Sequence, residues 1–379
     1  MRPRTSAENV AVRVLLGKLK RVPFAEAAAR QYLARPFSRS RRNKVVLAYW
    51  NNSLAWAQFY PFLYFARHFA RHGYEFRAVP CDRLASSSLV GDASALFLQS
   101  AYEPAPGQLE EALSELTSRH PNLAVSYFDW SATSDLRFSG RVAPWVSHYV
   151  KKSLFRDRSM YLRAPKGHTH LVDFFTARYG LTNPKPDWTV DASIVDKLML
   201  GPAFSTTHRL LPLFDRQRPP VHVERPIDVS GRVETGGTPW YSAMRAEAAA
   251  AVEKIEGVTV TSGRIGRRGF MRELRKSKIC FSPFGYGELC IRDFEAVAAG
   301  AVLLKPDMGH LETDPDVFIP WETYVPVRWD LEDLESKVRQ TLADTNLRER
   351  LARNAYDRVQ AHLHNGSLER LLEGLCSRG

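Results

Sequence analysis

The sequence predicts an α/β protein with two Rossmann-like, doubly wound domains that face each other across a cleft. Three observations lead to this fold class. Apolar, strand-like runs alternate with segments of helical length, this alternation begins twice, and a proline-rich stretch at residues 216–226 separates the two series. The chain has 379 residues, which is enough for two or three domains with cores of their own.

The first series begins with the unbroken apolar run KVVLAYW, which is typical of a buried strand. Gly73 ends the helix that follows, and Pro121 and Asn122 mark the end of the next one. The predicted strands are 44–50, 74–79, 95–99 and 123–128, and the predicted helices are 55–72 and 107–120.

The second series begins after the proline-rich linker and continues to the C-terminus. Its predicted strands are 227–233, 258–261, 278–282, 301–305 and 324–327, and its predicted helices are 239–255, 269–276, 289–299, 330–342 and 347–375. The resulting division is a basic amphipathic arm (1–43), a first Rossmann-like domain (44–222), a second Rossmann-like domain (223–345) and C-terminal helices (346–379).

The net charge of +12 is concentrated at the N-terminus. Residues 1–44 hold twelve basic side chains and two acidic ones, and apolar residues at 11, 14, 15, 19 and 22 recur at helical spacing. A basic amphipathic helix of this kind can lie in an anionic headgroup layer. The alternatives are a solvated arm, a helix that caps the first domain, and a mitochondrial transit peptide.

Composition excludes several protein classes. The longest strongly apolar stretch, residues 54–66, is shorter than the ~20 residues that a membrane span needs. The four cysteines form no CxxC pair, which predicts a reducing compartment and hence the cytoplasm. The basic arm extends this prediction to a peripheral position on the inner face of the cell membrane. No G-x-G-x-x-G follows the first strand, which counts against a dinucleotide enzyme.

The densest chemical signal lies in residues 277–307. An apolar strand leads into a loop with Gly285 and Gly287, which let the backbone approach a ligand, and a helix N-terminus follows that offers N–H groups to a phosphate. Arg292 and Glu295 share one helix face, where an arginine can bind a diphosphate and a carboxylate can bind ribose hydroxyls. The alternative is an ion pair between these two side chains on a solvated face.

This segment resembles the donor-binding half of GT-B-fold glycosyltransferases, especially bacterial family-1-like enzymes and the exostosin type. The resemblance covers about residues 227–330, and the matching residues are Pro283, Gly285, Gly287, Arg292, Glu295, Ala296 and Gly300. It implies transfer of a sugar from a nucleotide-sugar donor to a hydroxyl acceptor, with no protein-bound metal and no cofactor other than the nucleotide-sugar substrate.

The resemblance also implies roles for single residues. Glu295 is expected to bind the donor ribose, Arg292 the pyrophosphate, and Glu288 the sugar hydroxyls. Six residues separate Glu288 from Glu295, whereas many retaining members have seven, so inversion and retention both stay open. Lys305 at a strand end and Arg264 in a glycine-flanked loop are further phosphate candidates, and an ion pair with Asp307 is the alternative for Lys305.

In the first domain, polar residues follow two predicted strands. An inverting transferase needs a base for the acceptor proton, and Asp129, directly after strand 123–128, is the preferred candidate at the cleft edge. Asp135 lies in the same loop, and Asn51 and Asn52 after the first strand are predicted to line the acceptor side. The alternatives are helix caps and loop-stabilising hydrogen bonds.

The predicted function is therefore a glycosyltransferase in bacterial surface polysaccharide or glycolipid synthesis, with a glycan or lipid-linked acceptor. The basic arm suggests an anionic membrane surface as a further partner. One alternative is a catalytically inactive scaffold that binds a nucleotide or a glycan. Another is a nucleic-acid-associated protein that uses the arm, but no aromatic residues suited to stacking are interleaved with its charges, so no nucleic-acid partner is expected.

Overall fold

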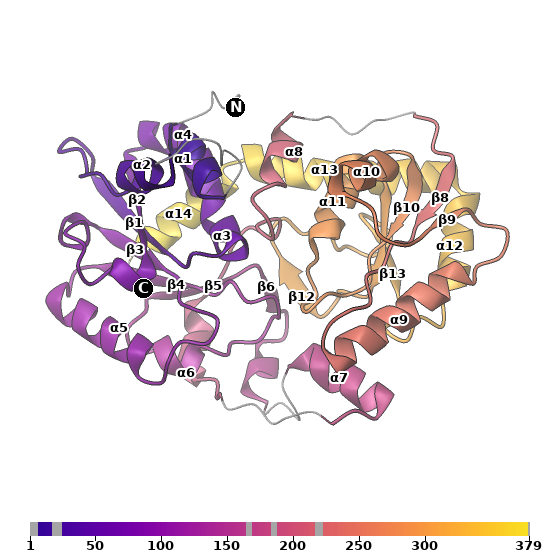
Figure 1. Ribbon diagram of the computed structural model, residues 1–379, viewed down its shortest axis with the longest axis horizontal. Helices are drawn as coiled ribbons and strands as arrows, with labels where there is room; N and C mark the ends of the chain where they lie inside the picture. The colour runs from indigo at the N-terminus through magenta and orange to yellow at the C-terminus, as the bar shows by residue number, and fades with distance from the viewer. Residues whose placement is uncertain (1–6, 17–24, 164–168, 183–187, 217–222, 378–379) are drawn as a thin grey trace.

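The computed structural model describes residues 7–16, 25–163, 169–182, 188–216 and 223–377, which form two lobes side by side (Figure 1). Each lobe is built on a parallel sheet. The strand orders are β2-β1-β3-β4-β5-β7 in the first lobe and β13-β11-β10-β8-β9 in the second. Counted along the chain, both sheets begin with the order 2-1-3-4-5, so the predicted pair of Rossmann-like domains is confirmed.

The strands are short and mostly buried, as expected for parallel sheets that are covered on both faces. The first sheet consists of β1 (Asn43–Tyr49), β2 (Tyr74–Pro80), β3 (Ala95–Leu98), β4 (Ala124–Phe128), β5 (His148–Lys151) and β7 (Leu198–Leu200). The second consists of β8 (Ile227–Ser230), β9 (Val260–Thr261), β10 (Ser277–Phe281), β11 (Val302–Pro306) and β13 (Val325–Val327). The sequence pattern missed β5 and β7, which have only four and three residues.

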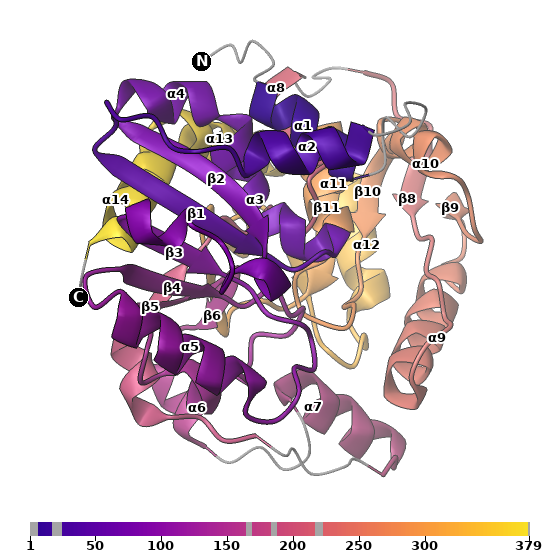
Figure 2. The ribbon, with the colours of Figure 1, turned by 60° about the vertical axis from the view of Figure 1, so that its left-hand side comes forward.

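Helices cover the sheets of both lobes (Figures 1 and 2). The N-terminal part of the chain contains α1 (Ala7–Leu15), α2 (Ala25–Leu33), α3 (Ser53–Tyr64), α4 (Ala66–Arg71), α5 (Gln108–Arg119), α6 (Ser139–Val142), α7 (His170–Tyr179) and α8 (Leu211–Arg216). The C-terminal part contains α9 (Pro239–Glu253), α10 (Arg267–Leu274), α11 (Ile291–Ala299), α12 (Leu334–Ala343), α13 (Thr345–His364) and α14 (Ser367–Cys376).

Two predicted long helices are each divided in the structure. The predicted helix 55–72 is α3 and α4, with Phe65 between them outside helical geometry. The predicted helix 347–375 is α13 and α14, because Gly366 between them has a left-handed φ of 83°. The second break lets the chain change direction after α13.

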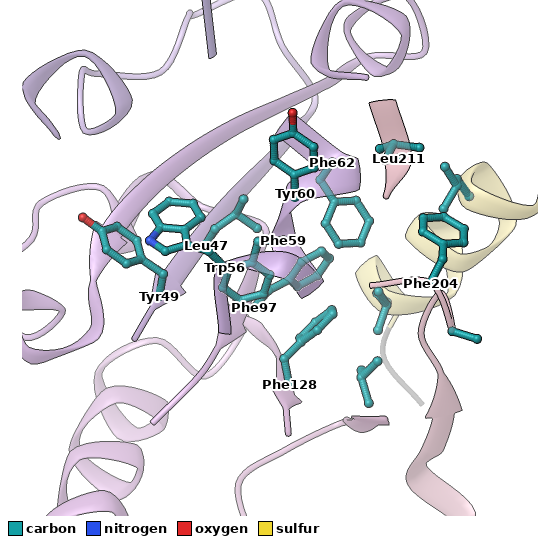
Figure 3. Packing of buried hydrophobic residues seen from close by; sticks show 14 of the residues in the cluster. Leu47, Tyr49, Trp56, Phe59, Tyr60, Phe62, Phe97, Phe128, Phe204 and Leu211 are labelled. Carbon is teal, nitrogen blue, oxygen red and sulfur yellow. The ribbon is translucent and has the colours of Figure 1, made fainter. Parts of the chain in front are cut away.

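Aromatic side chains between α3 and the first sheet form a large part of the main core. Figure 3 shows Trp56, Phe59 and Phe62 of α3 packed with Phe97 of β3 and Phe128 of β4. Helix α3 is buried around almost its whole circumference, since every residue from 55 to 64 is buried. Such a helix is expected within a core rather than on a surface.

Three connections tie the lobes together. Helix α14 returns to the first lobe, where Leu372 and Leu375 are fully buried. Strand β6 (Ser153–Phe155) pairs antiparallel with β12 (Leu311–Thr313) of the second lobe, and α7 packs on α9. The predicted domain boundary between residues 222 and 223 adjoins residues 217–222, which lie outside the described residues. Strand β6 and helix α14 each contact elements on the other side of this boundary.

The described part of the basic arm packs on the first lobe (Figure 2). Val12 of α1 and Leu33 of α2 are buried, and the Tyr60 hydroxyl donates a hydrogen bond to Asn9 Oδ1 at 3.0 Å. Of the apolar positions on which the amphipathic helix was predicted, 19 and 22 lie outside the described residues. The described apolar face points toward the domain, which corresponds to the capping alternative rather than to insertion into a headgroup layer.

Candidate active site

A cavity of about 650 Å³ lies between the two lobes. Its lining from the first lobe includes Trp130, Ser131, Thr133, Arg137, Lys152 and Thr206, and from the second lobe Thr238, Trp240, Tyr286, Leu289 and Ile291. Lys152 directly follows β5, Trp130 lies in the loop after β4, and Tyr286 lies in the loop after β10. Open α/β sheets bind ligands outside the carboxyl ends of their strands, where the strand order reverses. In the second lobe that point lies between β8 and β10.

The loop after β10 is held by a buried carboxylate. Asp293 accepts hydrogen bonds from Ser282 Oγ at 2.6 Å and from the Cys290 N–H at 2.8 Å, which caps α11. Lys305 Nζ lies 3.2 Å from Asp293 Oδ2, and both side chains are fully buried. The predicted phosphate-binding position of Lys305 is therefore wrong: its partner is Asp293, because the strand end of β11 lies inside the lobe.

The two glycines of this loop have different surroundings. A Cβ on Gly287 would lie 1.9 Å from the carbonyl oxygen of Ala132, so this glycine permits close contact between the lobes. The sequence pattern predicted that the backbone at this glycine approaches a ligand. In the structure, the backbone of Gly287 approaches the backbone of the first lobe. A Cβ on Gly285 would meet Cys290 Sγ at 3.3 Å.

Glu288 is enclosed at the contact between the lobes. It is 1% exposed, and its Oε2 accepts a hydrogen bond from Ser134 Oγ of the first lobe at 3.1 Å. Burial raises the pKa of the Glu288 carboxyl, and the nearby Asp135 adds to this effect. A carboxyl with a raised pKa is suited to proton transfer near neutral pH.

Helices α10 and α11 place charged side chains beside the strand ends of the second sheet. Glu295 is buried and pairs with Arg267, whose Nε lies 3.1 Å from Glu295 Oε1. Burial raises the pKa of Glu295, while Arg267 opposes that rise. The ion pair of Glu295 is thus with the neighbouring helix. Arg292 donates to the Phe281 carbonyl at 3.3 Å and lies over the Phe270 ring.

The other predicted phosphate ligand, Arg264, lies in the open. Its side chain is 87% exposed and lies 3.4 Å from Glu234 of the loop after β8.

In the first lobe, Asp129 lies beneath the cavity rather than at its edge. The carboxylate is fully buried and accepts hydrogen bonds from Tyr149 at 2.7 Å and Lys151 at 2.8 Å. Ser131 donates to the other carboxylate oxygen through both its N–H and its hydroxyl. The predicted cleft-edge position of Asp129 is wrong, because these donors hold the side chain in the interior and it does not line the cavity.

The remaining acceptor-side candidates have structural partners or are exposed. Asp135 is buried against Arg137, whose Nε lies 3.0 Å from Asp135 Oδ1, and Arg137 lowers the pKa of Asp135. Asn52 accepts from the Leu54 N–H at 2.8 Å and caps α3, which was its alternative interpretation. Asn51 is exposed after β1.

Residues 221–373 match a family model described as glycosyl transferase-like. The second lobe is therefore the part of the chain that is similar to this family. The match covers the whole second lobe, including β10, α11 and the Arg267–Glu295 pair, and it covers less than half of the chain. Together with two facing domains of the same strand order, it confirms the GT-B architecture that the resemblance implied.

Two solved structures illustrate the low level of similarity to known proteins. A glycosyltransferase from Rickettsia africae is 10% identical with a TM-score of 0.48, and the alignment covers 88% of this chain and 98% of that one. A putative UDP-N-acetylglucosamine 2-epimerase from Listeria monocytogenes is 10% identical with a TM-score of 0.43, covering 87% and 97% of the two chains. No curated protein sequence matches this chain. At these scores the fold assignment depends on the sheet topology itself.

Three basic residues near the interlobe cavity and the loops after β8 and β10 were not predicted from the sequence. Arg232 follows β8 at the switch point and pairs with Glu273 at 2.7 Å. Arg245 of α9 is buried and donates to the carbonyls of Glu234 and Phe284, joining the loops after β8 and β10. Lys152 follows β5 and lines the cavity. Of the three, only Arg232 had a usable sequence signal, because it lies with Gly231 at the end of the predicted strand 227–233.

Neither a metal-binding cluster nor a membrane-spanning helix is found among the described residues. Within the ranges given above, no group of three or more His, Cys, Asp or Glu side chains is arranged to hold a metal ion. No helix there combines the length and the apolar character that a bilayer crossing requires. Metal-independent transfer stays a prediction.

Proposed function

We propose that this protein transfers a sugar from a nucleotide-sugar donor to a hydroxyl group of a glycan or lipid-linked acceptor. The observation that carries the proposal is the glycosyl transferase-like match over the lobe whose β8/β10 switch point adjoins the interlobe cavity. A cavity of this size is in the usual range for small-molecule sites. The donor is proposed to bind the second lobe and the acceptor the first.

The roles proposed for the side chains follow from the negative charge of the departing diphosphate and from the hydroxyl groups of the donor. The bond between the sugar and the diphosphate breaks, a bond to the acceptor oxygen forms, and the acceptor proton moves to a base. Arg292 is proposed to bind the departing diphosphate and Glu295 the ribose hydroxyls. Glu288 is proposed to contact the sugar, exchanging its hydrogen bond with Ser134 for one to the ligand.

The roles of four other residues are reassigned within this proposal. Asp129, which is buried, is proposed to position the loop at 130–135 rather than to act as the base. Lys305 is proposed to hold Asp293 and with it the start of α11. Arg264 stays a candidate for steering the anionic donor, and Asn51 stays a candidate on the acceptor side.

The first test is nucleotide binding by the full chain. We expect one of UDP, GDP, CMP, dTDP and ADP to raise the melting temperature, equally with and without EDTA, since a ligand at 100 times its Kd adds about 2.7 kcal/mol. Glu295→Gln is expected to weaken this nucleotide at least tenfold, because hydrogen bonds to a charged group contribute about 1.5–3 kcal/mol.

The matched control is Glu253→Gln at the exposed end of α9, which is expected to bind like the wild type. Unchanged affinity in Glu295→Gln would contradict the role of this residue. Slow hydrolysis of the nucleotide sugar without acceptor is the expected mark of a transferase. A chain that binds the nucleotide but never hydrolyses the donor would instead be the scaffold considered above.

We further propose that the protein acts in the cytoplasm at the inner face of the cell membrane, in surface polysaccharide or glycolipid synthesis. The support is the charge of residues 1–44, since each basic side chain near an anionic surface contributes about 1 kcal/mol. Ala11 and Val12 of α1 pack inward, so the proposed attraction is electrostatic. Arg39 and Arg42 are exposed at the end of this segment.

The double variant Arg39→Glu/Arg42→Glu is therefore expected to sediment less with phosphatidylserine vesicles than the wild type, with the difference lost in high salt. Arg350→Glu/Arg353→Glu on α13 changes the net charge equally and is the control. Equal sedimentation of both double variants would count against a membrane role for the arm.

A further inference from the structure

Lys152 is a buried cation that lines the interlobe cavity without a carboxylate partner. It is 9% exposed, and its Nζ donates one long hydrogen bond, 3.4 Å, to the carbonyl oxygen of Trp130. In the part of the chain that the structure describes, no ion pair includes Lys152. Buried charges are normally paired, since the loss of hydration is otherwise uncompensated.

The neighbouring charges are already balanced. Lys151 pairs with Asp129 at 2.8 Å, and Arg137 pairs with Asp135 at 3.0 Å. Burial lowers the pKa of Lys152 to about 8, Lys151 adds to the lowering, and Asp129 opposes it. Lys152 is therefore the surplus positive charge on this side of the cavity.

The rest of the cavity wall suits a sugar. Among the described residues that line it, none is acidic, and hydroxyl side chains come from both lobes. The hydroxyl of Thr206, a residue that is 8% exposed, has no hydrogen-bond partner within the described residues. Trp130 and Trp240 add aromatic surface. A hydroxyl without a partner favours a polar occupant, and an ammonium group without a carboxylate partner favours an anionic one.

We propose that the acceptor carries an anionic group, a phosphate or a carboxylate, and that this group binds Lys152 inside the interlobe cavity. The inference rests on the proposed function and specifies its acceptor. It assigns the anion to the acceptor because Lys152 belongs to the first lobe. The predicted donor ligands Arg292 and Glu295 lie on α11 of the second lobe and do not line this cavity.

The experiment compares the wild type, Lys152→Met and the control Lys254→Met, an exposed lysine at the end of α9. Each full-length protein is titrated at constant ionic strength with glucose, glucose 6-phosphate and glucuronate, and separately with the nucleotide that stabilises the wild type. The wild type and the control are expected to bind glucose 6-phosphate or glucuronate more tightly than glucose. Lys152→Met is expected to lose this preference by at least tenfold while it keeps the nucleotide.

A second readout needs no ligand. Lys152→Met is expected to melt above the wild type at pH 7, because it removes a buried unpaired charge. The difference is expected to shrink between about pH 8 and pH 10.5: there the folded wild type holds a neutral amine while the unfolded chain is still protonated, so wild-type stability rises with pH.

The outcomes separate the two proposals. Equal binding of the three sugars by the wild type, equal anion affinity in Lys152→Met, or no gain in its melting temperature would overturn the anion site. Loss of the nucleotide alone in Lys152→Met would also overturn it and assign Lys152 to the donor diphosphate. If no nucleotide binds but the anionic sugars bind through Lys152, the proposed function fails and the anion site stands.

Discussion

Replacing Lys151 with methionine is expected to lower the free energy of unfolding by about 3–5 kcal/mol, because it leaves a buried carboxylate without its counterion. Lys151 and Asp129 are almost completely buried, and Nζ lies 2.8 Å from Asp129 Oδ2. The ammonium group also donates to Ser131 Oγ at 3.2 Å, so its loss affects the whole loop after β4. Urea-induced unfolding measures the change.

The double variant Asp129→Asn/Lys151→Met is the informative comparison. It removes both charges, so we expect it to recover part of the stability that Lys151→Met loses. Lys276→Met, an exposed lysine after α10, is expected to change the free energy of unfolding by less than about 0.5 kcal/mol. A Lys151→Met protein that unfolds at the same urea concentration as the wild type would show that Asp129 does not depend on this pair.

Replacing Gly287 with alanine is expected to separate the two lobes. The new Cβ would lie 1.9 Å from the Ala132 oxygen and 2.3 Å from its carbonyl carbon, and both are backbone atoms that no rotamer change can move. The φ of Gly287 is outside the left-handed region, so the effect comes from this contact and not from backbone strain. Overpacking of this kind costs about 1–3 kcal/mol.

Two measurements report whether the lobes separate in Gly287→Ala. Small-angle scattering is expected to give a larger radius of gyration, and donor hydrolysis is expected to fall at least tenfold because Glu288 is next to the contact. Gly236→Ala is the control, since a Cβ there meets nothing within 4 Å. Wild-type scattering and hydrolysis in Gly287→Ala would mean that the lobes do not need this close contact.

Local pattern was sufficient for much of the fold. The strand, glycine loop and helix in residues 277–299 were predicted to within about two residues, because an apolar run, turn residues and helical spacing are properties of neighbouring positions. Strands β5 and β7 were missed since three or four residues in a proline-rich region carry no periodicity. They become strands by pairing with β4 and with each other.

For the candidate site, too, some features follow from local sequence and others from the tertiary structure. The sequence by itself determined the two α/β domains, the glycine loop, and the positions of Arg292 and Glu295 on one helix. Only the tertiary structure decided that Asp293 neutralises Lys305, that Gly287 contacts Ala132, and that Lys152 is left unpaired in the cavity. The physical reason is that burial and charge pairing depend on residues that are distant in the chain, and a sequence pattern records which side chains are present but not which of them lose their water to one another.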